Sequence, residues 1–104
     1  MALEYSRVDG PVKTPSLTLY SLSYCEVCKE AGDLLSSLGL AYRYLLVDKL
    51  PRQQILQVKR EIQAEGQKSI LYPVLRIEGD ETLYGFDKEL WAQKLEQSVA
   101  AGSR

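Results

Sequence analysis

The chain has 104 residues, a length that suits one domain. Thirteen Lys and Arg residues against fourteen Asp and Glu residues give a formal net charge of −1, which argues against a nucleic-acid-binding protein. The chain has no histidine, and this excludes Ser–His and Cys–His catalytic pairs and removes the commonest metal ligand.

The first predicted elements are an arm, a strand and a helix. Residues 1–16 show no period and predict a loose N-terminal arm, of which a few residues could pair at a sheet edge. Leu17–Ser21 alternates apolar and hydroxyl residues, as a strand does. From Glu26 the apolar residues recur at helical spacing, and Gly39 is suited to end that helix in the left-handed region.

The second half of the chain predicts a helix between strands and then a hairpin. Tyr42–Val47 is rich in aromatic and branched residues and predicts a buried strand. Apolar residues at helical spacing follow between Pro51 and Gly66. Val74–Ile77 and Thr82–Tyr84, separated by a turn, form the predicted hairpin.

A last helix and the element order complete the predicted fold. Asp87 can cap this helix, which carries Leu90, Trp91 and Leu95 as core residues. The order β-α-β-α-β-β-α predicts an α/β protein with a four-stranded mixed sheet and helices on both faces. We expect the folded domain to span residues 17–97, with residues 98–104 as a C-terminal tail.

The two cysteines, Cys25 and Cys28, carry the chemical signal of the sequence. Cys25 comes just before the first turn of a helix, where free backbone N–H groups and the helix dipole favour a thiolate. Cys28 lies one turn further on, within reach of the first sulfur and on the apolar face of the helix. This asymmetry suits thiol–disulfide exchange, in which Cys25 attacks a disulfide and Cys28 resolves the mixed disulfide.

Three other readings of the cysteine pair remain open. The thiols could be idle in a binding module, in which case replacing Cys25 would leave its activity unchanged. A zinc site is less favoured, because structural zinc takes four ligands and the chain has two cysteines and no histidine. Two chains could supply four thiolates to a shared iron–sulfur cluster, which would make the protein a dimeric cluster carrier.

The segment Leu17–Leu95 resembles the glutaredoxins, a family with the thioredoxin fold. Three motifs carry the resemblance: Tyr24-Cys25-Glu26-Val27-Cys28-Lys29, Tyr72-Pro73-Val74 and Tyr84-Gly85-Phe86-Asp87.

The resemblance implies a role for each matching position. It makes Cys25 the nucleophile and Cys28 the resolving thiol, and it implies a cis proline at Pro73 against the active disulfide. It also implies that the backbone of Tyr72 pairs with a bound thiol peptide. The further substrate-binding residues are expected at three positions: Gly85 and Asp87, which would hold the far end of glutathione, and Tyr24, which could form an aromatic rim with Tyr72.

The sequence also departs from the usual glutaredoxin pattern. Leu22-Ser23-Tyr24 stands where the family commonly has a lysine for a glutathione carboxylate, and Lys68 and Arg76 are the nearest basic candidates to replace it. The Gly-Gly pair of the family is reduced here to Gly85-Phe86. The electron donor is therefore open between glutathione and a reductase protein.

The sequence also predicts where the protein works and with what partners. No apolar run approaches the roughly 18 residues of a membrane span, and residues 1–10 lack a secretory signal. We expect a cytoplasmic monomer that reduces disulfide-containing proteins, without a permanently bound cofactor or metal. We expect no nucleic-acid or membrane partner.

Overall fold

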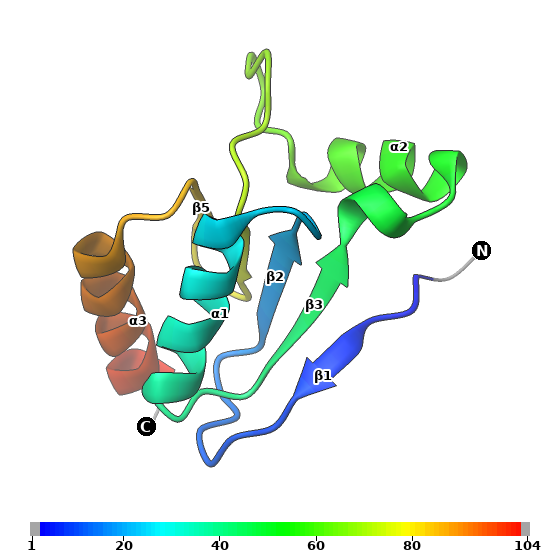
Figure 1. Cartoon of the computed structure of the whole chain (residues 1–104). Coiled ribbons are helices and arrows are strands. Elements are labelled where there is room, and N and C mark those ends of the chain that lie inside the picture. The colour runs from blue at the N-terminus through cyan, green and yellow to red at the C-terminus, as the bar shows by residue number, and fades with distance from the viewer. Residues whose placement is uncertain (1–2, 103–104) are drawn as a thin grey trace.

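The computed structural model describes residues 3–102, and their elements are shown in Figure 1. The strands are β1 (Ser6–Val8), β2 (Leu17–Ser21), β3 (Tyr42–Leu46), β4 (Val74–Ile77) and β5 (Thr82–Tyr84). The helices are α1 (Glu26–Ser37), the 3₁₀ helix η1 (Val47–Lys49), α2 (Arg52–Ile62) and α3 (Lys88–Gly102).

The strands form one mixed sheet in the order β1-β3-β2-β4-β5. Strands β2 and β3 run parallel, and each of the other neighbouring pairs is antiparallel. The predicted α/β class is thus confirmed. The predicted count of four strands is too low by one, because part of the arm pairs with β3 as the edge strand β1. With three residues and no buried face, β1 carries no hydrophobic alternation from which to predict it.

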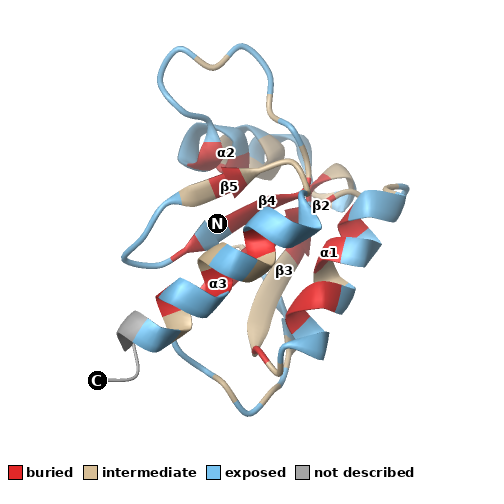
Figure 2. Ribbon diagram, turned by 90° about the vertical axis from the view of Figure 1, so that its left-hand side faces the viewer, coloured by how far each residue is buried: buried red, intermediate tan, exposed pale blue. Residues whose placement is uncertain are grey.

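The helices cover the two faces of the sheet. Helices α1 and α3 enclose one core, whose buried members include Leu19, Leu35, Leu75 and Trp91. The other core lies between the sheet and α2. Figure 2 shows buried residues on the sides of the helices that face the sheet. Because α2 lies near the ends of β2 and β3 (Figure 1), it covers one end of its face of the sheet.

Two helices end at positions other than those predicted. Helix α2 ends at Ile62 and not near Gly66, because Gln63 adopts an extended conformation, with φ −76° and ψ 124°. The turn that follows is held by Gln67, whose Oε1 accepts from the backbone N–H of Ala64 at 2.9 Å. Helix α3 continues beyond Gln97 to Gly102, and within this extension Ser98 is buried.

The apolar faces of the helices also differ from the predicted ones in detail. Trp91 and Leu95 are buried as expected, but Leu90 is 55% exposed, because it lies on the solvent side of α3. In α1, Leu34 is buried while Leu38, the helix cap, is exposed. Among the described helices, none is both long and apolar enough to cross a membrane.

Candidate functional site

Cys25 is the residue that caps the N-terminus of α1. Its backbone is extended, with φ −107° and ψ 110°, and its Sγ accepts a hydrogen bond from the backbone N–H of Cys28 at 3.2 Å. The sulfur therefore takes the place that a serine or aspartate oxygen usually holds at a helix start. A thiolate at this position would face the positive end of the helix dipole and a donating N–H group.

The two sulfurs form a disulfide and differ in their surroundings. The Cα atoms of Cys25 and Cys28 are 5.2 Å apart. Cys25 is half-buried, whereas Cys28 is 3% exposed and belongs to the buried face of α1. A substrate therefore reaches Cys25 more easily, and Cys28 is placed to react with Cys25.

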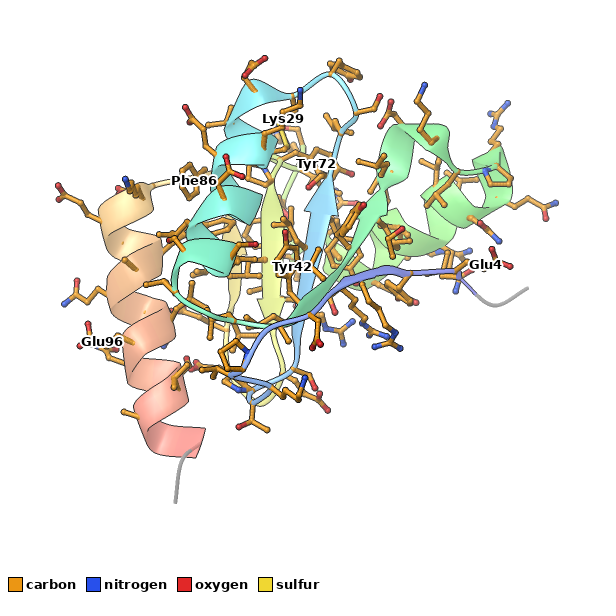
Figure 3. The ribbon with its side chains drawn as sticks, turned by 60° about the horizontal axis from the view of Figure 1, so that its bottom comes forward. Glu4, Lys29, Tyr42, Tyr72, Phe86 and Glu96 are labelled. Carbon is orange, nitrogen blue, oxygen red and sulfur yellow. A yellow bond between two sulfur atoms is a disulfide. The ribbon has the colours of Figure 1, made fainter. Side chains whose placement is uncertain are left out.

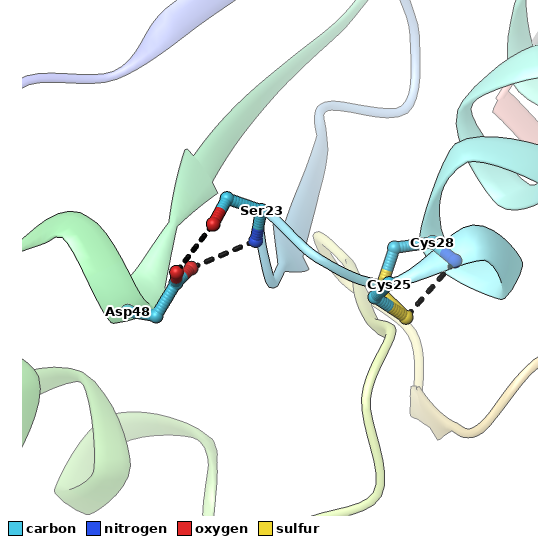
Figure 4. The surroundings of a disulfide bond; sticks show 4 residues. All are labelled: Ser23, Cys25, Cys28 and Asp48. Atoms are coloured by element: carbon cyan, nitrogen blue, oxygen red, sulfur yellow. Dashed lines mark hydrogen bonds between the residues drawn. A yellow bond between two sulfur atoms is a disulfide. The ribbon is translucent and has the colours of Figure 1, made fainter.

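Asp48 holds the loop that leads into Cys25. The backbone N–H and the hydroxyl of Ser23 both donate to the Asp48 carboxylate, at 2.8 and 2.5 Å (Figure 4). The bond from the hydroxyl is the largest cause of a lowered pKa of Asp48, followed by the bond from the backbone N–H. Asp48 could not be predicted as a site residue from the sequence, because it lies 25 positions from Ser23 and no local pattern joins them.

Tyr24 and Tyr72 lie close to the cysteine pair on two different segments. Tyr24 is 76% exposed, and Tyr72 is half-buried with a buried hydroxyl that has no hydrogen-bond partner among the described residues. Burial raises the pKa of Tyr72, and the neighbouring Tyr24 raises it further. Figure 3 shows Lys29 and Tyr72 at the end of the molecule where α1 begins. The effect of Tyr24 on Tyr72 indicates that the two tyrosines are near each other, and Tyr24 directly precedes Cys25 in the chain.

Pro73 follows Tyr72 through a cis peptide bond and is fully buried. The cis geometry that the family resemblance implied is thus present. The pairing of β4 with β2 begins at Val74, so the backbone of Tyr72 lies before the ladder.

Gly85 joins the end of the hairpin to the segment around Pro73. Its N–H donates to the carbonyls of Leu71 and Pro73 at 3.0 and 2.9 Å, and its own carbonyl accepts from Trp91 Nε1 at 2.9 Å. Its φ of +73° favours glycine, whereas a Cβ would meet nothing nearer than Leu71 at 3.8 Å. Gly85 is therefore required for its backbone conformation.

Asp87 caps α3, as the sequence predicts. Its Oδ1 accepts from the backbone N–H of Leu90 at 3.2 Å, and the carboxylate is exposed.

The two basic candidates for a carboxylate clamp are placed differently from each other. Lys68 is exposed in the connector before β4, whereas Arg76 lies within β4, opposite Thr18. Among the described residues, no group of three His, Cys, Asp or Glu side chains could hold a metal ion.

The glutaredoxin family model matches residues 17–81 of the chain. A glutaredoxin structure from Methanosarcina mazei Go1 is 26% identical, with a TM-score of 0.76 over 88% of this chain and 86% of the other. A glutaredoxin from Archaeoglobus fulgidus is 25% identical, with a TM-score of 0.64 over 80% and 84%. Methanoredoxin from Methanosarcina acetivorans, at 23% identity, shares the fold with a TM-score of 0.72 over 83% and 88%. A search of curated proteins gave no match.

Proposed function

Because the chain belongs to the glutaredoxin family, we propose that it is a thiol–disulfide oxidoreductase in which Cys25 is the nucleophile and Cys28 the resolving thiol. The family and the Cys25–Cys28 pair fit this class of reaction in general. The observation that carries the assignment of roles is the capping position of Cys25, whose sulfur accepts from the Cys28 N–H while the Cys28 sulfur is buried.

The proposed reaction starts from the reduced pair. The Cys25 thiolate attacks one sulfur of a substrate disulfide, and the other sulfur leaves as a thiolate that takes up a proton. Cys28 then loses its proton, and its sulfur attacks Cys25 Sγ in the mixed disulfide. This step forms the Cys25–Cys28 disulfide and releases the second substrate thiol, so two electrons pass from the protein to the substrate. Two glutathione molecules or a dithiol reductase protein would reduce the pair again.

The substrate would lie between the cysteine loop and the segment before β4. The backbone of Tyr72 lies outside the sheet ladder, so it is free to pair with an extended thiol peptide beside Pro73. Tyr24, which is largely exposed, would form the aromatic rim. Gly85 and Asp87 would bind the far end of glutathione, where Asp87 offers an exposed carboxylate for an ammonium group.

We also propose that the protein works as a cytoplasmic monomer without a resident cofactor or metal. Its partners would be disulfide-containing proteins and an electron donor, either glutathione or a reductase protein. The family typically uses such donors.

Mass spectrometry after equilibration in glutathione redox buffers tests this function. The native protein is expected to cycle between the dithiol and the Cys25–Cys28 disulfide, and Cys28→Ser is expected to keep a glutathione adduct on Cys25. If the pair cycles but no adduct forms, the electron donor would be a reductase protein and not glutathione.

The same samples separate the proposal from its rivals. If neither sulfur responds to the buffers, the exchange reaction is wrong and a binding module with idle thiols takes its place. If the protein purified under anaerobic conditions absorbs in the visible range and is dimeric, the iron–sulfur carrier replaces it.

A further inference from the structure

A row of polar side chains crosses the sheet beyond the edge of α2. The register pairs Arg7 with Arg43, Arg43 with Thr18, Thr18 with Arg76, and Arg76 with Thr82. Directly paired residues place their side chains on the same face of a sheet. These five residues, the arginine row, therefore cross all five strands on one face.

This face is the one that α2 partly covers. The residues two positions along from the row, among them Tyr5, Tyr20 and Val74, pack in the core beneath α2. No member of the arginine row belongs to either core cluster. Arg7 and Arg76 are exposed. Arg43 and Thr82 are half-buried, and Thr18 is buried at 4% exposure, so the arginines are the accessible part of the row.

The three arginines have no acidic partner in the described part of the chain. The ion pairs of that part are made by Lys13 and Lys94. Arg43 is fixed in place, because its Nε donates to Thr18 Oγ1 at 2.8 Å and its guanidinium lies 3.9 Å from the centroid of the Tyr5 ring. Within residues 3–102 its terminal nitrogens make no hydrogen bond, so Arg43 presents positive charge held in a defined position.

A hollow of about 590 Å³ adjoins the row, between the arm and the sheet. Arg7 and Arg43 line it together with Lys13, Asp9 and Glu78. Asp9 forms an ion pair with Lys13, whose Nζ lies 2.6 Å from the Oδ1 of Asp9. The hollow therefore offers two arginines and space for a chain segment beside them.

We propose that the arginine row is a docking surface for an acidic segment of a partner protein. Neighbouring strands lie about 5 Å apart, so the backbones of Arg7 and Arg43 are about 5 Å apart and those of Arg43 and Arg76 about 10 Å apart. Alternate residues of an extended segment lie about 7 Å apart, which the long arginine side chains can match. Guanidinium groups also bind carboxylates through two parallel hydrogen bonds.

The charges around the row favour an acidic peptide over a nucleic acid. Glu78 and Asp9 lie at the rim of the hollow, and the chain carries a net charge of −1. Glu78 would repel phosphates and carboxylates alike, but a phosphate backbone needs many cations to bind and the row has three. A short acidic segment can place its carboxylates on the three arginines alone.

The row and the cysteine pair lie at opposite ends of β2. Thr18 is near the start of this strand, and Cys25 follows its end. A segment docked on the row therefore leaves the sulfurs accessible, and it would add affinity for a partner without changing the exchange chemistry.

The test measures the fluorescence anisotropy of a labelled ten-residue peptide of alternating Glu and Ser. We expect binding at low ionic strength that weakens as salt is added. Arg7→Gln and Arg76→Gln are each expected to weaken binding about three- to fivefold, and the double variant about nine- to twenty-five-fold. Arg43 is left intact, because it also holds Thr18 and Tyr5.

Arg52→Gln is the matched control, since it removes the same charge from the exposed start of α2. Unchanged affinity in this control and no binding of a Lys-Ser peptide are expected. Equal peptide affinity in all variants, or tighter binding of a single-stranded oligonucleotide to the same arginines, would overturn the proposal. Redox cycling is measured on Arg7→Gln, a residue outside the proposed glutathione site, and should be unchanged, so a failure of docking is distinguishable from a failure of the exchange reaction.

Discussion

The position of Cys25 depends on two interactions of very different range. The capping contact with the Cys28 N–H is local, so the C-x-x-C spacing after a strand was sufficient to predict it. The clamp between Ser23 and Asp48 joins two segments 25 positions apart. Such a contact depends on the parallel pairing of β2 and β3, which brings the two strand ends together. For this reason the site residues at the helix start could be predicted and Asp48 could not.

Replacing Ser23 is expected to release the Asp48 carboxylate. The two hydrogen bonds from Ser23 lower the pKa of Asp48, and the bond from the hydroxyl is the larger cause. In Ser23→Ala the pKa of Asp48 should rise toward its ordinary value of about 3.9. Carboxyl carbon NMR over a pH titration measures both values. An ordinary pKa in the native protein, or no change in the variant, would contradict the clamp.

The same pair predicts how stability depends on pH. A carboxyl whose pKa is lowered by folding stabilises the native state above its unfolded pKa, about 3.9, and this contribution is lost as pH falls through the lower folded pKa. Native protein and Ser23→Ala should therefore differ in stability at neutral pH and converge well below pH 3.9. Denaturant unfolding at both pH values checks this. A constant difference at all pH values would count against a charged Asp48.

At the scale of elements, the hairpin strands and the N-terminal arm differ in how well they could be predicted. Val74–Ile77 and Thr82–Tyr84 are found at the predicted bounds, because both are rich in apolar, branched or aromatic residues and a turn separates them. The edge strand β1 is held mainly by its pairing with β3 and by two backbone hydrogen bonds of Val12, with Gly39 and Ala41. Because such main-chain contacts do not depend on particular side chains, they produce no pattern in the sequence from which the strand could be predicted.

Gly10→Ala is expected to displace the arm. A Cβ at Gly10 would lie 2.8 Å from the carbonyl oxygen of Gly39 and 2.9 Å from the carbonyl carbon of Leu40, and neither backbone atom can move cheaply. Amide hydrogen exchange should become faster in β1 and stay unchanged in β2 and β4. Glu4→Ala, an exposed change in the same arm, serves as the control. Native-like exchange in β1 of the glycine variant would show that the arm does not need this close approach.

Trp91 couples α3 to the hairpin, and its replacement tests that coupling. The side chain is 1% exposed, donates to the Gly85 carbonyl and meets Phe86 edge to face with ring centroids 5.1 Å apart. Trp91→Phe should lower the free energy of unfolding by about 1–3 kcal/mol, because it removes the N–H donor and leaves space. Leu90→Ala, on the exposed side of the same helix, should change it by no more than about 0.5 kcal/mol. Both free energies are measured by denaturant unfolding. If Trp91→Phe and Leu90→Ala lowered the free energy of unfolding equally, the contacts of Trp91 would not be what holds α3 to the hairpin.

At the scale of the whole molecule, the fold separates two surfaces. The loop after β2, the segment before β4 and the turn after β5 meet at one end and assemble the cysteine pair, Pro73 and Gly85. The arginine row lies toward the other end of the sheet. The first surface could be predicted from three short motifs, since each motif lies at the end of a predicted strand. The second could not, because it requires the register of five strands, and for the arm the sequence indicated only that a few residues could pair at a sheet edge.

The central claim is that the two thiols are unequal, and the rate of alkylation against pH tests it most directly. The reduced native protein, Cys25→Ser and Cys28→Ser are treated with iodoacetamide from pH 4 to 10, and each site is followed by mass spectrometry. The account predicts that Cys25 is modified first, with a pKa below the value of about 8.5 for a free thiol, while Cys28 reacts slowly. Faster modification of Cys28, or equal rates with an ordinary pKa at both sulfurs, would contradict it.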